Sequence, residues 1–418
     1  MTIMLTKLPS GLTVVTDHME SVETISIGVW VGSGTRNERS EWNGIAHLLE
    51  HMAFKGTGRR TAQAIAEEIE AVGGQLNAYT AREHTAYYAK VLSDDLALAI
   101  DILADILQNS SFDPTELERE RSVVLQEIGQ ARDTPDDIVF DHFQAAAFPD
   151  QPMGRSVLGT TDIVGHMGRD ALFDYMRSQY AAEKMILAAA GRVDHTRLVE
   201  LAREHFLGLL PNGHFKPDPA RYVGGEIREE RALEQLHLVV GFDGVPFDDP
   251  DYYAASALST LLGGGMSSRL FQEVREKRGL AYNIYSFGSS YSDSGLFGIY
   301  AGTSESMVDE LVRVVGGETV AIADKVGQGE IDRARAQLKA SILMALESTG
   351  ARCERLATNL LVYGRIIPIE EIVAQIDAID ETAIRRVARR ILESRPTIAA
   401  VGPTRTLDAY DSIAGRFR

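Results

Sequence analysis

Hydrophobic and polar positions in the first half of the chain follow strand-like and helix-like spacings by turns. Short apolar runs predict strands at Thr24–Val31, Leu76–Tyr79, Thr85–Val91 and Met185–Ala190. Helical periodicity predicts helices over Gly44–Phe54, Thr61–Val72, Asp94–Leu107, Pro114–Arg132 and Ala171–Tyr180. The order lacks the regular strand–helix–strand rhythm of a parallel sheet. We therefore expect an α+β fold with mostly antiparallel sheets and helices packed on one face.

The second half repeats this plan. A strand at Leu236–Phe242, a helix at Ala254–Leu262 and a further helix at Met307–Val315 follow one another as their counterparts do earlier in the chain. A turn-rich stretch rich in Gly, Pro and Asn precedes the repeat. The predicted organisation is one half over residues 1–210, a linker over 211–225 and a second, homologous half over 226–418.

The composition narrows the choice of function. The chain has 60 acidic and 42 basic residues and a net charge of −18, so nucleic acid is not expected as a partner. No apolar run is long enough to span a membrane, and the N-terminal residues do not resemble a signal peptide. Cys353 is the only cysteine, which excludes an internal disulfide. Together these features favour a cytoplasmic protein.

The strongest chemical motif is His47-Leu-Leu-Glu50-His51 on the first predicted helix. Histidines four residues apart lie one helical turn apart with Cβ atoms about 5–6 Å from each other, so both rings can reach one Zn²⁺. Glu50 projects to the same side and is placed to accept a proton from water. Chance gives this pattern in at most roughly three of a hundred chains of this length, which favours metal binding over a structural histidine pair.

A catalytic zinc usually has three protein ligands, so a third is needed. The predicted helix that begins after Asp113 carries several carboxylates. Two of them, Glu120 and Glu127, share a face but lie seven residues, or about 10 Å, apart along the axis. Spacing alone does not choose between them, and a solvated acidic face would give the same pattern.

Five segments in both halves carry a resemblance to a known family. They read GIAHLLEHMAFKG at 44–56, LNAYT at 76–80, ERERSVVLQEI at 118–128, LLGGGMSSRL at 261–270 and REKRGLAY at 275–282. The chain resembles the pitrilysin-type zinc metallopeptidases, whose motif is the inversion of His-Glu-x-x-His. Within them it is similar to the β-subunit of the mitochondrial processing peptidase and its bacterial homologues. The resemblance covers essentially the whole chain.

The resemblance implies one Zn²⁺ per chain, held by His47, His51 and Glu127. Glu50 would be the general base, and Glu120 a supporting carboxylate beside the site. The second half would lack zinc ligands but would contribute contacts to the substrate and the transition state.

The resemblance also implies residues that meet the substrate. Asn77 and Ala78 would lie on a strand to which an extended peptide adds. Arg275 and Tyr282, in the second half, would act at the scissile carbonyl, where a hydroxyl stabilises an oxyanion. Asp137 would meet an arginine close before the cleaved bond, together with Asp141 four residues later.

The predicted function is a zinc-dependent endopeptidase that hydrolyses unfolded or short peptides, preferably basic ones, in a clam-like chamber formed by the two halves. A homodimer, or a heterodimer with a homologous subunit, is expected. Two alternatives stay open: a non-catalytic core or scaffold subunit of a larger complex, and a catalytic subunit that is active only with a zinc-free partner chain.

Overall fold

The chain divides into two compact units. The computed structural model describes residues 2–210 and 217–418. Unit 1 comprises residues 1–129, 156–218 and 344–366, and unit 2 comprises residues 130–155, 219–343 and 367–418. Each unit is therefore assembled from separate stretches of sequence.

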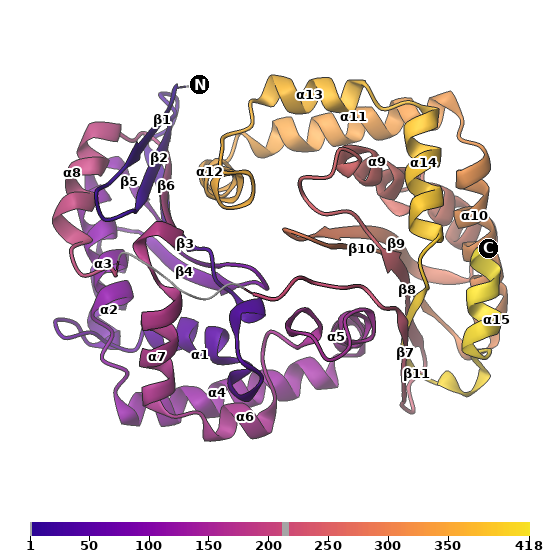
Figure 1. The fold of residues 1–418 in the computed structure, drawn as a ribbon, viewed down its shortest axis with the longest axis horizontal. Coiled ribbons are helices and arrows are strands. Elements are labelled where there is room, and N and C mark those ends of the chain that lie inside the picture. The colour runs from indigo at the N-terminus through magenta and orange to yellow at the C-terminus, as the bar shows by residue number, and fades with distance from the viewer. Residues whose placement is uncertain (1, 211–216) are drawn as a thin grey trace. The chain divides into compact units, whose positions relative to one another are not determined.

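Unit 1 is built on a six-stranded sheet (Figure 1). Its strands are β1 (Thr2–Lys7), β2 (Thr13–His18), β3 (Thr24–Val31), β4 (Gln75–Thr80), β5 (Thr85–Leu92) and β6 (Met185–Gly191), in the spatial order β1-β2-β6-β3-β5-β4. All neighbours are antiparallel except β2 and β6. The strand β4 is at one edge of the sheet and pairs only with β5 among the described residues.

Most helices of unit 1 pack on one face of this sheet. They are α1 (Ile45–Ala53), α2 (Ala62–Ala71), α3 (Leu96–Gln108), α4 (Pro114–Asp133), α6 (Thr161–His166), α7 (Arg169–Gln179) and α8 (His195–His205). The core between helices and sheet is formed by aliphatic residues that include Ile27, Leu48 and Ile100, all fully buried. Strand side chains alternate between the two faces of a sheet. The alternating apolar residues that mark β3 and β5 in the sequence are therefore the ones that face the helices.

Unit 2 repeats the arrangement with five strands. They are β7 (Gly225–Glu230), β8 (Leu236–Asp243), β9 (Ala281–Ser290), β10 (Gly295–Thr303) and β11 (Thr397–Gly402), in the order β7-β11-β8-β10-β9. Here too one pair, β7 and β11, is parallel and the others are antiparallel. The strand β9 takes the edge position that β4 has in unit 1.

The remaining helices belong to the second half of the sequence, except one. They are α5 (Pro135–Ala147), α9 (Tyr252–Gly263), α10 (Val308–Asp324), α11 (Gln328–Ala345), α12 (Thr349–Tyr363), α13 (Ile369–Asp377), α14 (Glu381–Leu392) and α15 (Tyr410–Ala414). Among the described helices, none combines the length and apolar character needed to cross a bilayer.

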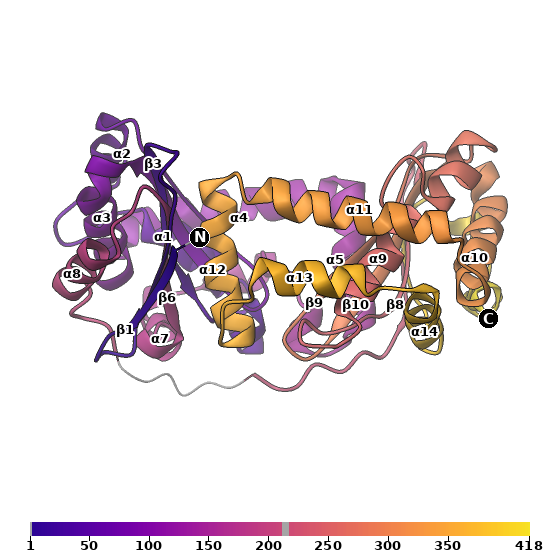
Figure 2. The same cartoon turned by 90° about the horizontal axis from the view of Figure 1, so that it is seen from above.

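The two halves of the sequence exchange one helix each. Helix α12, from the second half, packs on β6, β3 and β2 of unit 1, and Figure 2 shows it on the opposite side of that sheet from α3 and α8. Cys353, Leu356 and Ala357 of α12 are buried there against Trp30 and Ala188. Helix α5, from the first half, packs in the same way on β11, β8 and β7 of unit 2. Each sheet is thus covered on its second face by a helix from the other half of the sequence.

The α+β class predicted from the sequence is confirmed. The strand predicted at Thr24–Val31 has the bounds of β3, and the helix predicted at Gly44–Phe54 is one residue longer at each end than α1. The exchanged helices mean that a single cut at a linker does not separate the two compact units. Of the linker expected at 211–225, residues 211–216 lie outside the described residues, and 217–224 form no helix or strand.

Candidate metal and catalytic site

Helix α1 presents three polar side chains on its otherwise buried surface. His47, Glu50 and His51 are partly exposed, whereas the helix buries six apolar residues, among them Leu48 and Met52. In such a helix the polar side chains stay accessible, while the apolar side chains anchor the helix in the core.

The start of α1 is held by a buried carboxylate. Glu38 accepts hydrogen bonds from the backbone amides of Gly44 and Ala46, each at 2.9 Å, and so satisfies N–H groups that have no partner within the helix. Gly44 has φ 97°, and a Cβ there would lie 2.8 Å from the carbonyl oxygen of Leu158. Only glycine fits this position without strain, so the orientation of α1 is fixed where the polar strip begins.

His47, His51 and Glu127 form a group that could bind a metal. One ligand atom from each lies within 4.8 Å of the others. Glu127 Oε2 is 3.6 Å from His47 Nε2 and 3.5 Å from His51 Nε2. These separations are long for hydrogen bonds, but a tetrahedral Zn²⁺ site with bonds of about 2.1 Å has ligand atoms about 3.4 Å apart. The donor set of two imidazoles and one carboxylate is also one that zinc uses, so the residues fit the metal.

The contacts of His51 distinguish the roles of Glu120 and Glu127, which the sequence spacing alone left open. Its Nε2 faces Glu127, and its Nδ1 lies 3.0 Å from Glu120 Oε2. The other oxygen of Glu120 is 2.7 Å from Lys55 Nζ. A carboxylate on the second nitrogen of a metal-binding histidine fixes its tautomer and leaves Nε2 with a free lone pair. The structure therefore puts Glu127 in the metal group and Glu120 behind it.

Both carboxylates are placed by α4. Asp113 caps this helix by accepting hydrogen bonds from the amides of Thr115 at 2.8 Å and Glu116 at 3.2 Å, which lowers the pKa of Asp113. From this fixed start, the seven-residue separation of Glu120 and Glu127 brings them to one side of α4, two turns apart.

His47 is held in its neutral form. Burial, with a smaller contribution from His51, lowers its pKa to about 4. A neutral imidazole at pH 7 has a lone pair available for a metal. The Nδ1 atom of His47 is buried and has no hydrogen-bond partner among the described residues.

Glu50 lies beside the metal group and is oriented by a neighbouring strand. The hydroxyl of Thr80, at the end of β4, donates a 2.6 Å hydrogen bond to Glu50 Oε2. Burial raises the pKa of Glu50, and this effect exceeds the opposing influence of Thr80. A carboxylate of raised pKa is a better proton acceptor, and the hydrogen bond keeps it at the same end of α1 as the two histidines.

Asn77 and Ala78 lie on the edge strand β4. Ala78 is buried on the face of the sheet that meets α1, and the exposed Asn77 points to the other face. The Oδ1 atom of Asn77 accepts a hydrogen bond of 2.8 Å from the amide of Ala78. Since β4 is an edge strand, one side of its backbone is available for pairing with an added strand.

Similarity to known proteins extends over nearly the whole chain. Residues 13–161 match the family described as Insulinase (Peptidase family M16), and residues 166–338 match the domain described as Peptidase M16 inactive domain. An uncharacterized zinc protease of Rickettsia felis is 41% identical over 400 residues, which cover 96% of this chain and 97% of that protein. The chain belongs to the M16 peptidase family.

Two further relatives and one solved structure are also similar to this M16 chain over most of its length. An uncharacterized zinc protease of Streptomyces coelicolor is 39% identical, with 99% of this chain and 93% of the relative covered. A probable mitochondrial-processing peptidase subunit beta of Arabidopsis thaliana is 40% identical, with 98% and 80% covered. A solved structure of a Helicobacter pylori protease, 23% identical, superposes with a TM-score of 0.89 over 96% of this chain and 99% of that one, which supports the fold.

Four of the predicted site residues of this M16 chain belong to unit 2. Arg275, in a short π-helical turn (Phe271–Glu276), has its guanidinium carbon 4.4 Å from the ring centre of Tyr282, whose side chain is 75% exposed on β9. Such a cation–π contact holds the two side chains together. Asp137 and Asp141 lie one turn apart on α5, and Asp137 is exposed. The metal group itself consists of unit 1 residues alone.

Two contacts of the M16 site were not predicted from the sequence. Thr80 orients Glu50, and Lys55 shares Glu120 with His51. The alternation of β4 carried a signal for Thr80, because positions 76, 78 and 80 share the face that meets α1. Lys55 follows His51 by four residues, but it lies just beyond the end of α1, where helical spacing no longer fixes direction.

Proposed function

We propose that the protein is a zinc-dependent endopeptidase that hydrolyses extended peptides. The observation that carries the proposal is the placement of Glu50 on the same helix face as His47 and His51, with Glu127 completing a three-ligand group. Two of the ligands and a base of raised pKa thus lie on one nine-residue helix. Zinc held there would supply Lewis acidity toward the peptide carbonyl and would make water easier to deprotonate.

The side chains around the metal group divide the remaining work. Glu50 accepts the proton of the attacking water and returns it to the leaving amine, while Thr80 fixes its orientation. Glu120 accepts the Nδ1 proton of His51 and thereby keeps Nε2 free. Lys55 offsets the charge of Glu120, which is 6% exposed and would be unfavourable there without partners.

The edge strand supplies the substrate site in this proposal. A peptide that pairs with β4 gains main-chain hydrogen bonds beside Asn77 and Ala78, in the same strand whose last residue contacts Glu50. Backbone pairing tolerates many sequences and requires an extended, unfolded chain. The net charge of −18, together with Asp137 and Asp141 on α5, favours basic peptides.

The test is the Glu50→Gln variant. It keeps both histidines and Glu127, so it should retain about one zinc per chain while kcat on a quenched basic peptide falls by roughly 10²–10⁴-fold. Glu67→Gln, which removes a carboxylate from an exposed position on α2, should leave kcat unchanged. Wild-type rates in Glu50→Gln would overturn the mechanism.

A measurement of zinc content would distinguish the proposed enzyme from the scaffold alternative. A catalytic chain should contain about one zinc per molecule and lose activity on treatment with a chelator. The Arabidopsis relative is named as a subunit, so the assay is made both with the isolated chain and with a co-purified partner chain. Activity only in the second assay would mean that this chain needs the partner chain for catalysis.

A further inference from the structure

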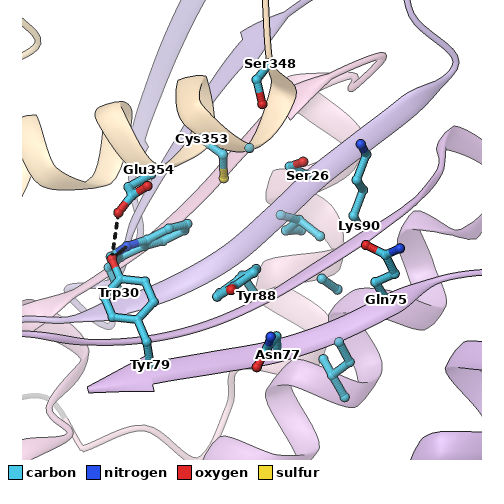
Figure 3. A pocket seen from close by; sticks show the side chains of 14 residues that line it. Ser26, Trp30, Gln75, Asn77, Tyr79, Tyr88, Lys90, Ser348, Cys353 and Glu354 are labelled. Atoms are coloured by element: carbon cyan, nitrogen blue, oxygen red, sulfur yellow. Dashed lines mark hydrogen bonds between the residues drawn. The ribbon is translucent and has the colours of Figure 1, made fainter. Parts of the chain in front are cut away.

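We infer that the cavity on the far side of the edge strand β4 is a binding site for a basic side chain of the peptide substrate, with Glu354 as the residue that determines this specificity. The inference rests on the proposed function, because it requires a peptide strand added to β4. The cavity has a volume of about 550 Å³ and lies within unit 1, between the strands β3, β5 and β4 and the exchanged helix α12 (Figure 3). It is separate from the metal group, which lies on the other face of the sheet.

Strand alternation links the cavity to the site of cleavage. Gln75, Asn77 and Tyr79 point into the cavity, whereas Thr80 points to the opposite face and contacts Glu50. A peptide strand paired with β4 must alternate in the same way, so every second side chain turns toward α1 and the others turn toward the cavity. The cavity therefore meets only one of the two faces of a bound peptide.

One end of the cavity is suited to a cation. Figure 3 shows Glu354 of α12 above Tyr79 and Trp30, and the hydroxyl of Tyr79 donates a 3.0 Å hydrogen bond to Glu354 Oε1. Trp30 Nε1 in turn donates to the hydroxyl of Tyr79 at 3.2 Å. Glu354 is exposed and forms no ion pair within the part of the chain that the structure describes. A carboxylate flanked by two aromatic rings can bind a guanidinium or ammonium group by charge and by cation–π contact.

A histidine near this carboxylate does not neutralise its charge. His84 Nε2 lies 3.1 Å from the hydroxyl of Tyr79. Burial lowers the pKa of His84, and this exceeds the opposite effect of Glu354 and Glu83. The imidazole is neutral at pH 7, so the negative charge of Glu354 is left for a ligand.

The other end of the cavity carries the opposite charge. Lys90 is exposed, pairs across the sheet with Gln75 and forms no ion pair among the described residues. Gln75 and Tyr79 are four residues apart on β4, so the two ends are separated by about 13 Å. A basic side chain is favoured at the Glu354 end and disfavoured at the Lys90 end. Because Tyr79 adjoins Thr80, the favoured position belongs to a peptide residue close to the bond that is cut.

The experiment measures peptide binding in the Glu50→Gln background, where cleavage does not interfere. A fluorescent, neutral peptide of extended sequence carries one arginine, which is moved one position at a time. We expect Kd to alternate with a period of two residues, with about tenfold tighter binding at the best position than at its neighbours. Adding Glu354→Gln should weaken the best position about tenfold and remove the alternation.

The controls separate this inference from the proposed function. The side-chain amide introduced by Glu354→Gln can still accept the hydrogen bond from Tyr79, so the fold should be kept. Glu20→Gln removes the same charge from another exposed position of unit 1 and should leave the alternation intact. A scan without alternation, an equal loss at every position, or no peptide binding would overturn the inference. If Glu354→Gln removes the alternation while the Glu50-containing parent cleaves no peptide, the binding site stands and the proposed catalysis fails.

Discussion

Units 1 and 2 arrange five strands in the same way, but only unit 1 has a metal group in the described residues. The order β2-β6-β3-β5-β4 in unit 1 corresponds to β7-β11-β8-β10-β9 in unit 2, with the single parallel pair in the same place. The first helix after the third strand of unit 1 is α1, and α9 follows the corresponding strand β8. When the C-terminal ends of α1 and α9, Ala53 and Gly263, are aligned, His47 and His51 correspond to Ala257 and Leu261, which are both buried. The same backbone plan thus presents either a group that could bind a metal or buried core residues, depending on a few side chains on one helix.

The largest expected effect concerns the stability of the metal-free protein toward acid. His47 has a pKa of about 4 in the folded protein and 6.5 as its ordinary value. Between these values the unfolded chain binds a proton that the folded chain does not, so stability falls as the pH drops from 6.5 to 4. This shift corresponds to a loss of at most about 3 to 4 kcal/mol.

Replacing His47 by the residue of the other unit sharpens this test. In His47→Ala, which copies Ala257 of α9, the loss should be absent. The measurement is the free energy of unfolding in urea at several pH values, with a chelator present. If the free energy of unfolding depended on pH in the same way in the parent and in His47→Ala, burial of His47 would not destabilise the folded protein in acid.

The next effect concerns the carboxylate behind His51. Glu120→Gln weakens the acceptor at Nδ1 and leaves Lys55 without its ionic partner, so zinc affinity should fall about 10–100-fold. Competition with a chromophoric chelator measures this. Glu116→Gln, at the start of the same helix, should retain the parent affinity, and an equal loss in both variants would argue for a general effect on α4 instead.

The smallest effect asks whether unit 2 has chemistry of its own. If the Tyr282 hydroxyl stabilises the oxyanion, Tyr282→Phe should lower kcat about tenfold or more, with zinc content unchanged. Tyr285→Phe is the matched control on the same strand, because its ring is stacked on Tyr300 within unit 2. Identical kcat values for the two variants would leave unit 2 a structural role at this position.

Much of the fold could be predicted from the sequence, because strands and helices of unit 1 are strongly periodic. Helix α1 buries six apolar residues around its polar strip, and seven of the eight residues of β3 are buried. The exchange of α5 and α12 could not be predicted. Both helices have ordinary amphipathic patterns, and periodicity shows that a helix buries a face without showing which sheet covers it.

The site, too, has a part that could be predicted from the sequence and a part that could not. The spacing of His47, Glu50 and His51 depends on one helix, so the sequence contains their geometry. Whether Glu120 or Glu127 joins them depends on how α4 packs against α1, and spacing left that open. The contact between Thr80 and Glu50 joins a strand to a helix 30 residues away in the sequence. The alternation of β4 shows which face of the sheet Thr80 is on, but not that its hydroxyl reaches Glu50.

The exchanged helix α12 has a consequence for synthesis of the chain. On the second face of the first sheet, Trp30, Ile186 and Ala188 are buried by residues of α12. A ribosome that has finished residue 210 has made every strand of that sheet, but the helix that covers this face ends only at Tyr363. For about 150 further residues the nascent chain exposes an aromatic and aliphatic surface. We expect this surface to become buried only when α12 has been made and has packed on the sheet.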